Sequence, residues 1–165
     1  VKNKKIYESL LKLRTHGGIK RNQHDIIGYN SRLDEIQAAI LDIKLKHINT
    51  LIKKRINVAQ MYYKLIKNEK IRLPYLDTNA VHTFNQFTIR VKNRNKLEKH
   101  LQKNKIPYGI YYPKPIYKYK AYADFKYNDL PMVKKVSDQC LSLPIYPELG
   151  LEDIKIICNV LNDYE

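Results

Sequence analysis

An amide and a guanidinium stand two residues apart in a polar loop, at Asn30 and Arg32. From Leu33 onward, apolar side chains recur at three- and four-residue steps, which predicts a helix. An amide donor just before a helix N-terminus is suited to hold an anion, because the amide and the helix dipole both favour negative charge. The planar fork of Arg32 can hold a phosphate group or pair with a carboxylate at an interface. Alternatively, Asn30 and Ser31 only cap the helix.

A second candidate segment, from Tyr108 to Tyr127, is rich in tyrosine and carries Pro113 and Pro115. Some of these tyrosines must fill a core or an interface, because the segment is too aromatic for a solvated linker. Their aromatic faces and hydroxyl groups could also contact a ligand.

Histidines and cysteines are present, but their spacing does not indicate a metal site. His16 and His24 lie in the loop before Asn30 without a third ligand, so we interpret them as hydrogen-bonding loop residues that could approach an active site. Cys140 and Cys158 form no CxxC or Cys/His pattern, and each is expected to be a buried small hydrophobic residue. Neither a zinc site nor a disulfide framework is predicted.

The bulk composition narrows the class of protein. The 165 residues are enough for one domain, with at most a small appended element, and 44% hydrophobic content excludes disordered and collagen-like chains. A net charge of +15 attracts phosphate-bearing partners, although a compositionally biased genome would also produce such a lysine-rich chain. The lack of a membrane-spanning run or signal peptide indicates the cytoplasm. The chain begins at Val1 rather than Met, so we expect it to be cut from something longer.

The loop that carries Asn30 is expected to lie between two helices. Residues 6–13 predict a helix that ends before the pair Gly17-Gly18. Ser31 predicts the start of the next helix, with Asp34 as its capping-box partner. No Pro or Gly interrupts residues 32–72, which predicts one very long helix or two helices with a bend near residues 49–50. A helix of this length with a single apolar stripe must pack along another subunit or a second domain.

The remaining elements predict a small mixed domain. Residues 84–91 read as a strand, with Phe87, Ile89 and Val91 on one face and Thr88 and Arg90 on the other. Three helices are expected, one around residues 97–101, one opened by Pro131 with Val133, Val136 and Cys140 inward, and one burying Ile154, Ile157, Cys158 and Leu161. A short buried strand is expected at 141–143. The chain is therefore predicted to be α/β or α+β.

The string GYNSRLDEIQAAIL, residues 28–41, resembles the GxNxRxDxxQAAIL signature of the DegT/DnrJ/EryC1/StrS family of pyridoxal-phosphate-dependent sugar aminotransferases. Supporting matches follow the family's order: RTHG at 14–17, HTFNQFTIRV at 82–91, IYYPKP at 110–115 and LSLP at 141–144. The resemblance implies the C-terminal part of a type I pyridoxal-phosphate-dependent transferase fold. Residues 1–32 would then be the tail of the large domain and an active-site loop, 33–72 a long connecting helix, and 73–165 a small C-terminal α/β domain.

The same resemblance implies a function. The complete protein would transfer an amino group from an amino acid such as glutamate to a keto-sugar nucleotide, as a homodimer. The lysine that binds the cofactor in relatives lies upstream, in a Ser-Lys segment that nothing here matches, so we expect this chain to be inactive alone and not to bind pyridoxal phosphate covalently. Its partner would be a second copy or the missing N-terminal half. The alternative is a non-catalytic remnant or interaction domain that keeps the family dimer surface; a nucleic-acid binder has no motif behind it.

Site residues are also implied by the resemblance. Asn30 would reach across the dimer to the cofactor phosphate of the neighbouring subunit. Substrate-binding roles fall on Arg32, Tyr111, Tyr112, Lys114 and Tyr117. Relatives commonly have His where Tyr117 and Tyr146 stand, so the identity of the sugar is open. The resemblance assigns no catalytic residue and no metal ligand to this chain.

Overall fold

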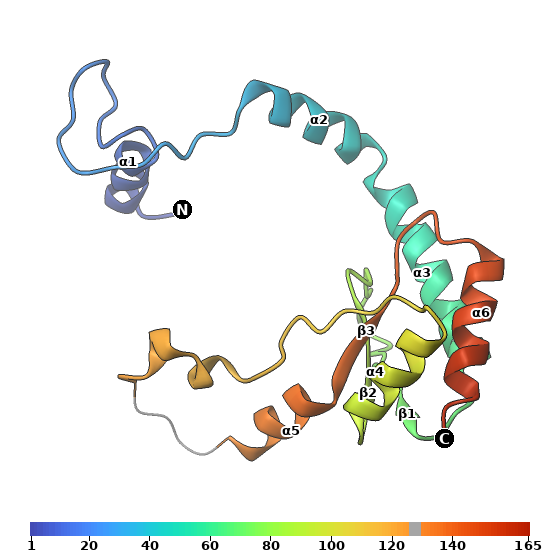
Figure 1. The fold of residues 1–165 in the computed structure, drawn as a ribbon. Helices are drawn as coiled ribbons and strands as arrows, with labels where there is room; N and C mark the ends of the chain where they lie inside the picture. Colours follow the sequence, from blue (N-terminus) through green and yellow to red (C-terminus); the bar gives the residue numbers. More distant parts are fainter. Residues whose placement is uncertain (126–129) are drawn as a thin grey trace. The chain divides into compact units, whose positions relative to one another are not determined.

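The computed structural model describes residues 1–125 and 130–165, and it divides the chain into two compact units, Val1–Ile48 and Asn49–Glu165 (Figure 1). The helices are α1 (Lys4–Leu13), α2 (Glu35–Lys46), α3 (Ile48–Leu65), α4 (Arg94–Lys103), α5 (Pro131–Gln139) and α6 (Leu151–Asn162), with 3-10 turns η1 (Ile116–Lys118) and η2 (Lys120–Tyr122). The strands are β1 (Ile71–Arg72), β2 (Phe87–Val91) and β3 (Cys140–Leu143). The predicted α/β class is confirmed, and Tyr127 of the tyrosine-rich segment lies outside the described residues.

In the first unit, a loop of residues 14–31 leaves α1 and returns to its end. Thr15 and Asn30 form an antiparallel bridge, and the Tyr29 N–H donates to the Leu13 carbonyl over 2.7 Å. The two arms meet where Gly17 lies against Gly28, since a Cβ on Gly28 would fall 2.1 Å from the Gly17 nitrogen. Both glycines are therefore required by the close approach of two backbones.

The second helix begins later than the sequence predicts. Ser31 does not start it; α2 begins at Glu35, with Asp34 as an N-cap whose side chain makes no capping hydrogen bond. The predicted capping box is therefore wrong. The physical reason is that the Ser31 N–H donates to the Arg14 carbonyl over 3.0 Å. This bond keeps residues 29–31 paired with the end of α1, so they do not form the first turn of a helix.

The uninterrupted stretch after Leu33 forms two helices, the second of the two alternatives. The break falls at His47, two residues before the expected bend, where the backbone leaves helical geometry at φ −105° and ψ 1°. None of the residues of α2 is buried, and Ile36, Ile40 and Ile43 are all at least half exposed. Within the first unit, Val1–Ile48, the apolar stripe of α2 is thus left exposed.

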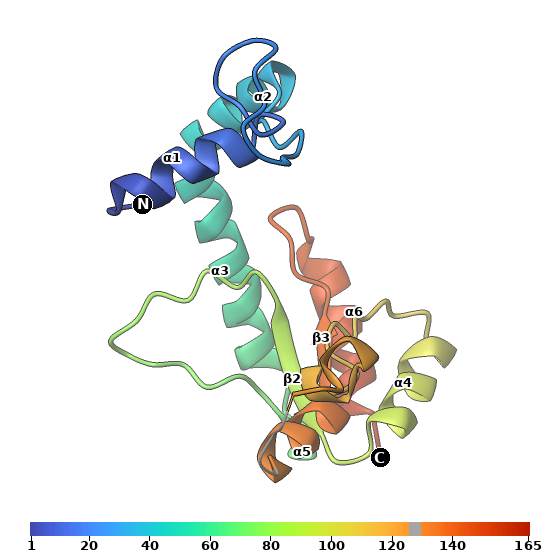
Figure 2. The ribbon, with the colours of Figure 1, turned by 90° about the vertical axis from the view of Figure 1, so that its left-hand side faces the viewer.

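The second unit is built on a three-stranded antiparallel sheet in the order β1-β2-β3. In the register of β2 and β3, Thr88 pairs with Ser142 and Arg90 with Cys140. Phe87, Ile89 and Val91 alternate with these polar residues and are buried, as predicted. The sheet therefore has one apolar face and one polar face. Figure 2 shows residues 73–86 as a wide loop that joins β1 to β2.

The apolar face of the sheet carries the core. Buried residues of α3, α4 and α6 join the inward residues of β2 in one hydrophobic cluster (Figure 1). Tyr62 of α3 is fully buried, its ring centroid 4.9 Å from that of Phe87, and its hydroxyl donates to the Pro144 carbonyl over 2.7 Å. Burial raises the pKa of the Tyr62 hydroxyl well above its usual value. The predicted inward face of the last helix, including Cys158, is confirmed.

Two local predictions in this unit are wrong. The strand begins at Phe87 rather than at residue 84, because Phe84 has a positive φ of 49° that no strand accommodates. The helix opened by Pro131 does not turn Val133 inward; its buried residue is Ser137, whose hydroxyl donates to the Val133 carbonyl. Cys140 follows the helix as the first residue of β3 and is half-buried rather than buried.

Candidate functional site

The Asn30–Arg32 pair lies on the surface of the first unit, and both side chains are exposed. The Arg32 Nε donates to the Asn30 Oδ1 over 3.2 Å, which orients the amide. Within residues 1–125 and 130–165, no group accepts a hydrogen bond from the Asn30 Nδ2. The amide therefore keeps both N–H groups for a ligand, next to the positive charge of Arg32.

The loop around this pair is held from several sides. The Lys12 ammonium of α1 lies 2.6 Å from an Asp25 carboxylate oxygen, and this ion pair holds the pKa of Asp25 below its usual value. A His24 ring nitrogen lies 2.8 Å from the His16 carbonyl oxygen. The His24 ring thus bonds within the loop, His16 takes part through its backbone carbonyl, and the loop fixes the backbone from which the Asn30 side chain projects.

One part of the sequence argument for Asn30 is wrong. Because α2 starts at Glu35, the dipole of that helix does not begin beside Asn30, and Asp34 with Glu35 places negative charge at the helix start. An anion at this loop would therefore find its donors in the Asn30 amide and the Arg32 guanidinium rather than in the helix start. Two such donors fit an oxygen-rich anion such as a phosphate ester, which accepts several charge-assisted hydrogen bonds.

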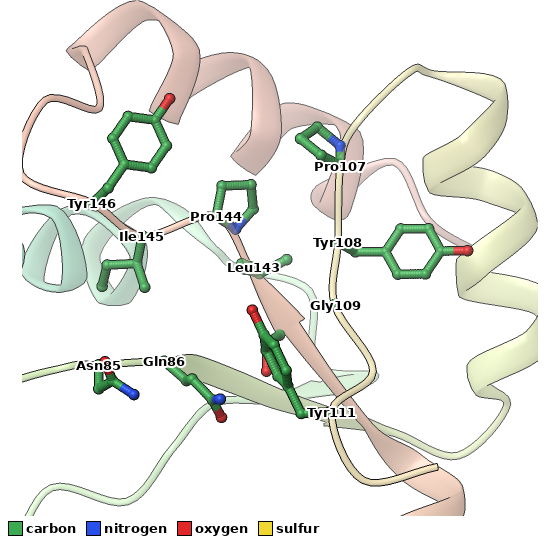
Figure 3. Close-up of a pocket in the computed structure, with 11 residues that line it drawn as sticks. Asn85, Gln86, Pro107, Tyr108, Gly109, Tyr111, Leu143, Pro144, Ile145 and Tyr146 are labelled. Carbon is green, nitrogen blue, oxygen red and sulfur yellow. The ribbon is translucent and has the colours of Figure 1, made fainter. Parts of the chain in front are cut away.

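In the second unit, a hollow of about 350 Å³ opens between the segment 107–111 and the turn after β3 (Figure 3). We call it the tyrosine hollow, and its lining includes Asn85, Gln86, Tyr108, Tyr111, Pro144 and Tyr146. Figure 3 shows Asn85 and Gln86 at the start of β2, with the ring of Tyr111 standing over the strands. Aromatic rings and side-chain amides around one cavity are suited to a sugar ring.

A second hollow of about 200 Å³ lies on the polar face of the sheet, and we call it the side hollow. Its lining includes Thr88, Tyr112, Val136, Cys140, Leu141 and Ser142. Gln86, Gly109, Tyr111 and Ser142 line both hollows, so the two cavities share a wall. Burial raises the pKa of the Cys140 thiol although Arg90 and Arg94 oppose the effect, so the thiol stays protonated near neutral pH and is a poor nucleophile.

The structure brings together only part of the predicted substrate set. Tyr111 lines both hollows and Tyr112 lines the side hollow, whereas Lys114 and Tyr117 line neither. The Lys114 ammonium instead lies 4.3 Å from the ring centroid of Tyr119. The roles of all these residues in binding a substrate stay predictions.

Sequence reasoning did not assign a role to Asn85, Gln86 or Ser142. Gln86 and Thr88 lie on the same face of the strand because side chains alternate, a signal already visible in the pattern of residues 86–91. Ser142 could not be placed beside Thr88 without the register of β2 and β3, which the sequence does not contain. Strand alternation thus provided a signal for one of the three residues.

Two kinds of feature are absent from the described residues. No helix there combines the length and apolar character needed to cross a bilayer. In the same residues, no group of three or more His, Cys, Asp and Glu side chains is arranged to hold a metal ion.

Comparison with known proteins places the chain among aminotransferases. The chain is 35% identical over 157 residues to dTDP-3-amino-3,6-dideoxy-alpha-D-galactopyranose transaminase of Aneurinibacillus thermoaerophilus, covering 95% of this chain and 43% of that protein. It is 36% identical over 155 residues to UDP-2-acetamido-2-deoxy-3-oxo-D-glucuronate aminotransferase of Pseudomonas aeruginosa, with 94% and 43% covered. The chain therefore spans less than half the length of these relatives.

The fold agrees with these sequence relatives. The crystal structure of S. venezuelae DesV, in complex with a ketimine intermediate, matches 98% of this chain and 44% of its own, with a TM-score of 0.87 and 31% identity. The family model of the DegT/DnrJ/EryC1/StrS aminotransferases matches residues 1–162, which include the Asn30 loop, both hollows and all of the core except Tyr164. From this match over nearly the full length, together with the shared fold, the chain belongs to the DegT/DnrJ/EryC1/StrS aminotransferase family.

Proposed function

We propose that this chain is the C-terminal portion of a nucleotide-sugar aminotransferase, which transfers an amino group from an amino acid such as glutamate to a keto-sugar nucleotide. The main support is the family match over residues 1–162, a range that contains the Asn30 loop and the tyrosine hollow. Aminotransferases of this family use pyridoxal phosphate, which when bound supplies the electron sink for amino transfer. The lysine-bearing segment would come from a sequence outside these 165 residues, and the protein is expected to act in the cytoplasm.

Asn30 is proposed to donate from its Nδ2 to the cofactor phosphate of a neighbouring subunit. Support comes from its amide, which Arg32 orients while leaving both N–H groups unused within the described part of the chain. Arg32 would hold the diphosphate of the nucleotide sugar with the N–H groups that do not face Asn30. Tyr111 and Tyr112 would contact the sugar, with Lys114 and Tyr117 on the same segment.

The dimer surface is proposed to include α2. Its apolar stripe is exposed within the first unit, with Ile36 77% exposed and Ile43 60% exposed. A stripe of large aliphatic side chains in water is unfavourable, and burial against a partner stabilises it by roughly 25 cal/mol per Å². The exposed stripe also fits the alternative of a non-catalytic interaction domain, which would keep the surface without the chemistry.

Activity separates the two functions. In the complete protein that carries this chain with its lysine-bearing segment, glutamate and a keto-sugar nucleotide should yield 2-oxoglutarate and an amino sugar. The isolated chain, treated with pyridoxal phosphate and borohydride, should show no labelled unique lysine by mass spectrometry. A unique labelled lysine would overturn the assignment of the lysine to another segment.

The role of Asn30 is tested by cofactor retention. Asn30→Ala in the complete protein should weaken retention of pyridoxal phosphate, and Asn30→Asp should weaken it more because a carboxylate repels the phosphate. Asn57→Ala, an exposed amide on α3, serves as the matched control and should retain the cofactor normally. Equal retention in all three variants would contradict the proposed role of Asn30.

A further inference from the structure

We infer that the side hollow receives a neutral, amide-bearing substituent of the sugar, an acetamido group, and that Gln86 is the residue that recognises it. This inference rests on the proposed function, because it places the sugar ring in the tyrosine hollow. It goes further by naming the substrate class, which is nucleotide sugars with an acetamido group attached to the sugar ring.

Gln86 stands where the two hollows meet. It lines both of them, and it is the half-buried residue just before β2 on the same side as Thr88. In the part of the chain that the structure describes, its side-chain amide makes no hydrogen bond, whereas the hydroxyl groups of Thr88 and Ser142 lie 2.8 Å apart and bond each other. Gln86 therefore keeps one acceptor and two donors for a ligand, more than any other group in the shared wall.

Charge decides what kind of group can enter. Among the described residues, no Asp, Glu, Lys or Arg side chain lines either hollow, although the chain as a whole carries +15. A carboxylate in the side hollow would lose its hydration without gaining a cation in return. Neither guanidinium group near that face lines a hollow. Arg94 pairs with Glu98 and donates to the Ser137 and Cys140 carbonyls. Arg90 donates to Gln139, and its buried Nε has no hydrogen-bond partner among the described residues.

Part of the side hollow is apolar. Val136 and Leu141 line it alongside the hydroxyl pair, so a group with both a methyl and a polar end is complementary. An acetamido group has a methyl for these residues, an N–H for the Gln86 oxygen and a carbonyl for the Gln86 amide. The volume of about 200 Å³ has room for such a group, since a water molecule takes about 30 Å³ of liquid volume.

The wall itself is fixed by Gly109. Its N–H donates to the Ser142 carbonyl over 2.9 Å, and its carbonyl accepts from the Ser142 N–H over 2.8 Å. The ring of Tyr111 lies so close to Gly109 that a Cβ there would fall 3.0 Å from the ring carbons. Gly109 thus acts as a positioning residue that holds the ring between the two hollows.

The test compares three probes on the complete protein by isothermal titration calorimetry: UDP-N-acetylglucosamine, UDP-glucose and UDP-glucuronic acid. UDP-N-acetylglucosamine should bind about tenfold more tightly than UDP-glucose, as loss of one hydrogen-bonded group predicts. Gln86→Leu should reduce that ratio to about threefold or less, because it should weaken the binding of UDP-N-acetylglucosamine more than the binding of UDP-glucose. Gln60→Leu, an exposed glutamine on α3, is the matched control and should keep the full ratio.

A second variant keeps the test decisive if Gln86→Leu does not fold. Val136→Phe fills the side hollow and should weaken UDP-N-acetylglucosamine binding selectively. Equal affinity for the two neutral sugars, or a full ratio in folded Gln86→Leu, would overturn this inference while leaving the proposed function intact. Tightest binding of UDP-glucuronic acid would also overturn it and would implicate Arg90. If none of the probes binds, the inference is overturned, and amino transfer by the complete protein then decides separately on the proposed function.

Discussion

The hydroxyl of Tyr62 ties α3 to the turn that lines the tyrosine hollow, so its removal should weaken the second unit. Tyr62→Phe deletes the 2.7 Å hydrogen bond to the Pro144 carbonyl but keeps the ring against Phe87, so no cavity forms. An acceptor left without its donor costs about 1–3 kcal/mol when buried. Because Pro144 is only half-buried, we expect the free energy of unfolding to fall by about 1–2 kcal/mol.

Urea unfolding of the 165-residue chain measures this change. With a slope of about 2 kcal/mol per molar urea, the midpoint should fall by about 0.5–1 M. Far-UV circular dichroism follows the helices, and the NMR signals of the Phe87 and Ile89 amides report on the second unit alone. Tyr63→Phe is the matched control: its hydroxyl donates to the Pro74 carbonyl over 2.9 Å from a half-buried ring, so the cost should be about 0.5 kcal/mol.

Two results would refute this reasoning. Tyr62→Phe could unfold at the midpoint of the unaltered chain, or Tyr63→Phe could cost more than Tyr62→Phe. Either result would mean that burial does not determine how much each of these two hydrogen bonds contributes to the free energy of unfolding.

Three further predictions concern the loop, the thiol and the core. Gly28→Ala should disrupt the loop of residues 14–31, because the added Cβ would fall 2.1 Å from the Gly17 nitrogen. Changes in the NMR chemical shifts of that loop would measure the effect. Gly150→Ala is the control and should be neutral, because its added Cβ would have no neighbouring atom closer than 3.6 Å. Burial raises the pKa of the Cys158 thiol to about 11 from 9.0, so the folded state binds that proton more tightly. The stabilisation from this thiol should be complete below pH 9 and fall between pH 9 and 11 by up to about 2–3 kcal/mol. Urea midpoints in Cys158→Ala should lose this share of the pH dependence and keep the share of Tyr62, whose pKa burial also raises. Leu101→Ala, at a fully buried position, should lower the free energy of unfolding by about 2–5 kcal/mol in calorimetry.

The family of the protein could be read from short strings of residues, because a motif of the length of residues 28–41 is a local property of the chain. The last helix and the apolar face of β2 were also predictable. Their apolar side chains recur at the spacing of a helix or a strand, and this spacing alone predicts which face of the element is buried. Leu161 and Ile89, both fully buried, are examples.

Errors arose where a long-range contact overrode a local signal. Ser31 has the right residue type for a helix start, but its N–H is taken by the Arg14 carbonyl, and the helix starts at Glu35. The helix opened by Pro131 ends in time for Cys140 to pair with Arg90 in the sheet. Local propensity differs by only tenths of a kcal/mol between neighbouring positions, so one tertiary hydrogen bond can move a boundary.

By itself, the sequence determined the class of fold, the family and the polar segments that carry its chemistry. Only the tertiary structure decided that Gln86, Tyr111 and Ser142 share a wall, and that Lys114 turns to Tyr119 instead. The reason is that a helix or strand face repeats along the chain, whereas a cavity is formed by residues far apart in sequence whose meeting depends on strand register and packing.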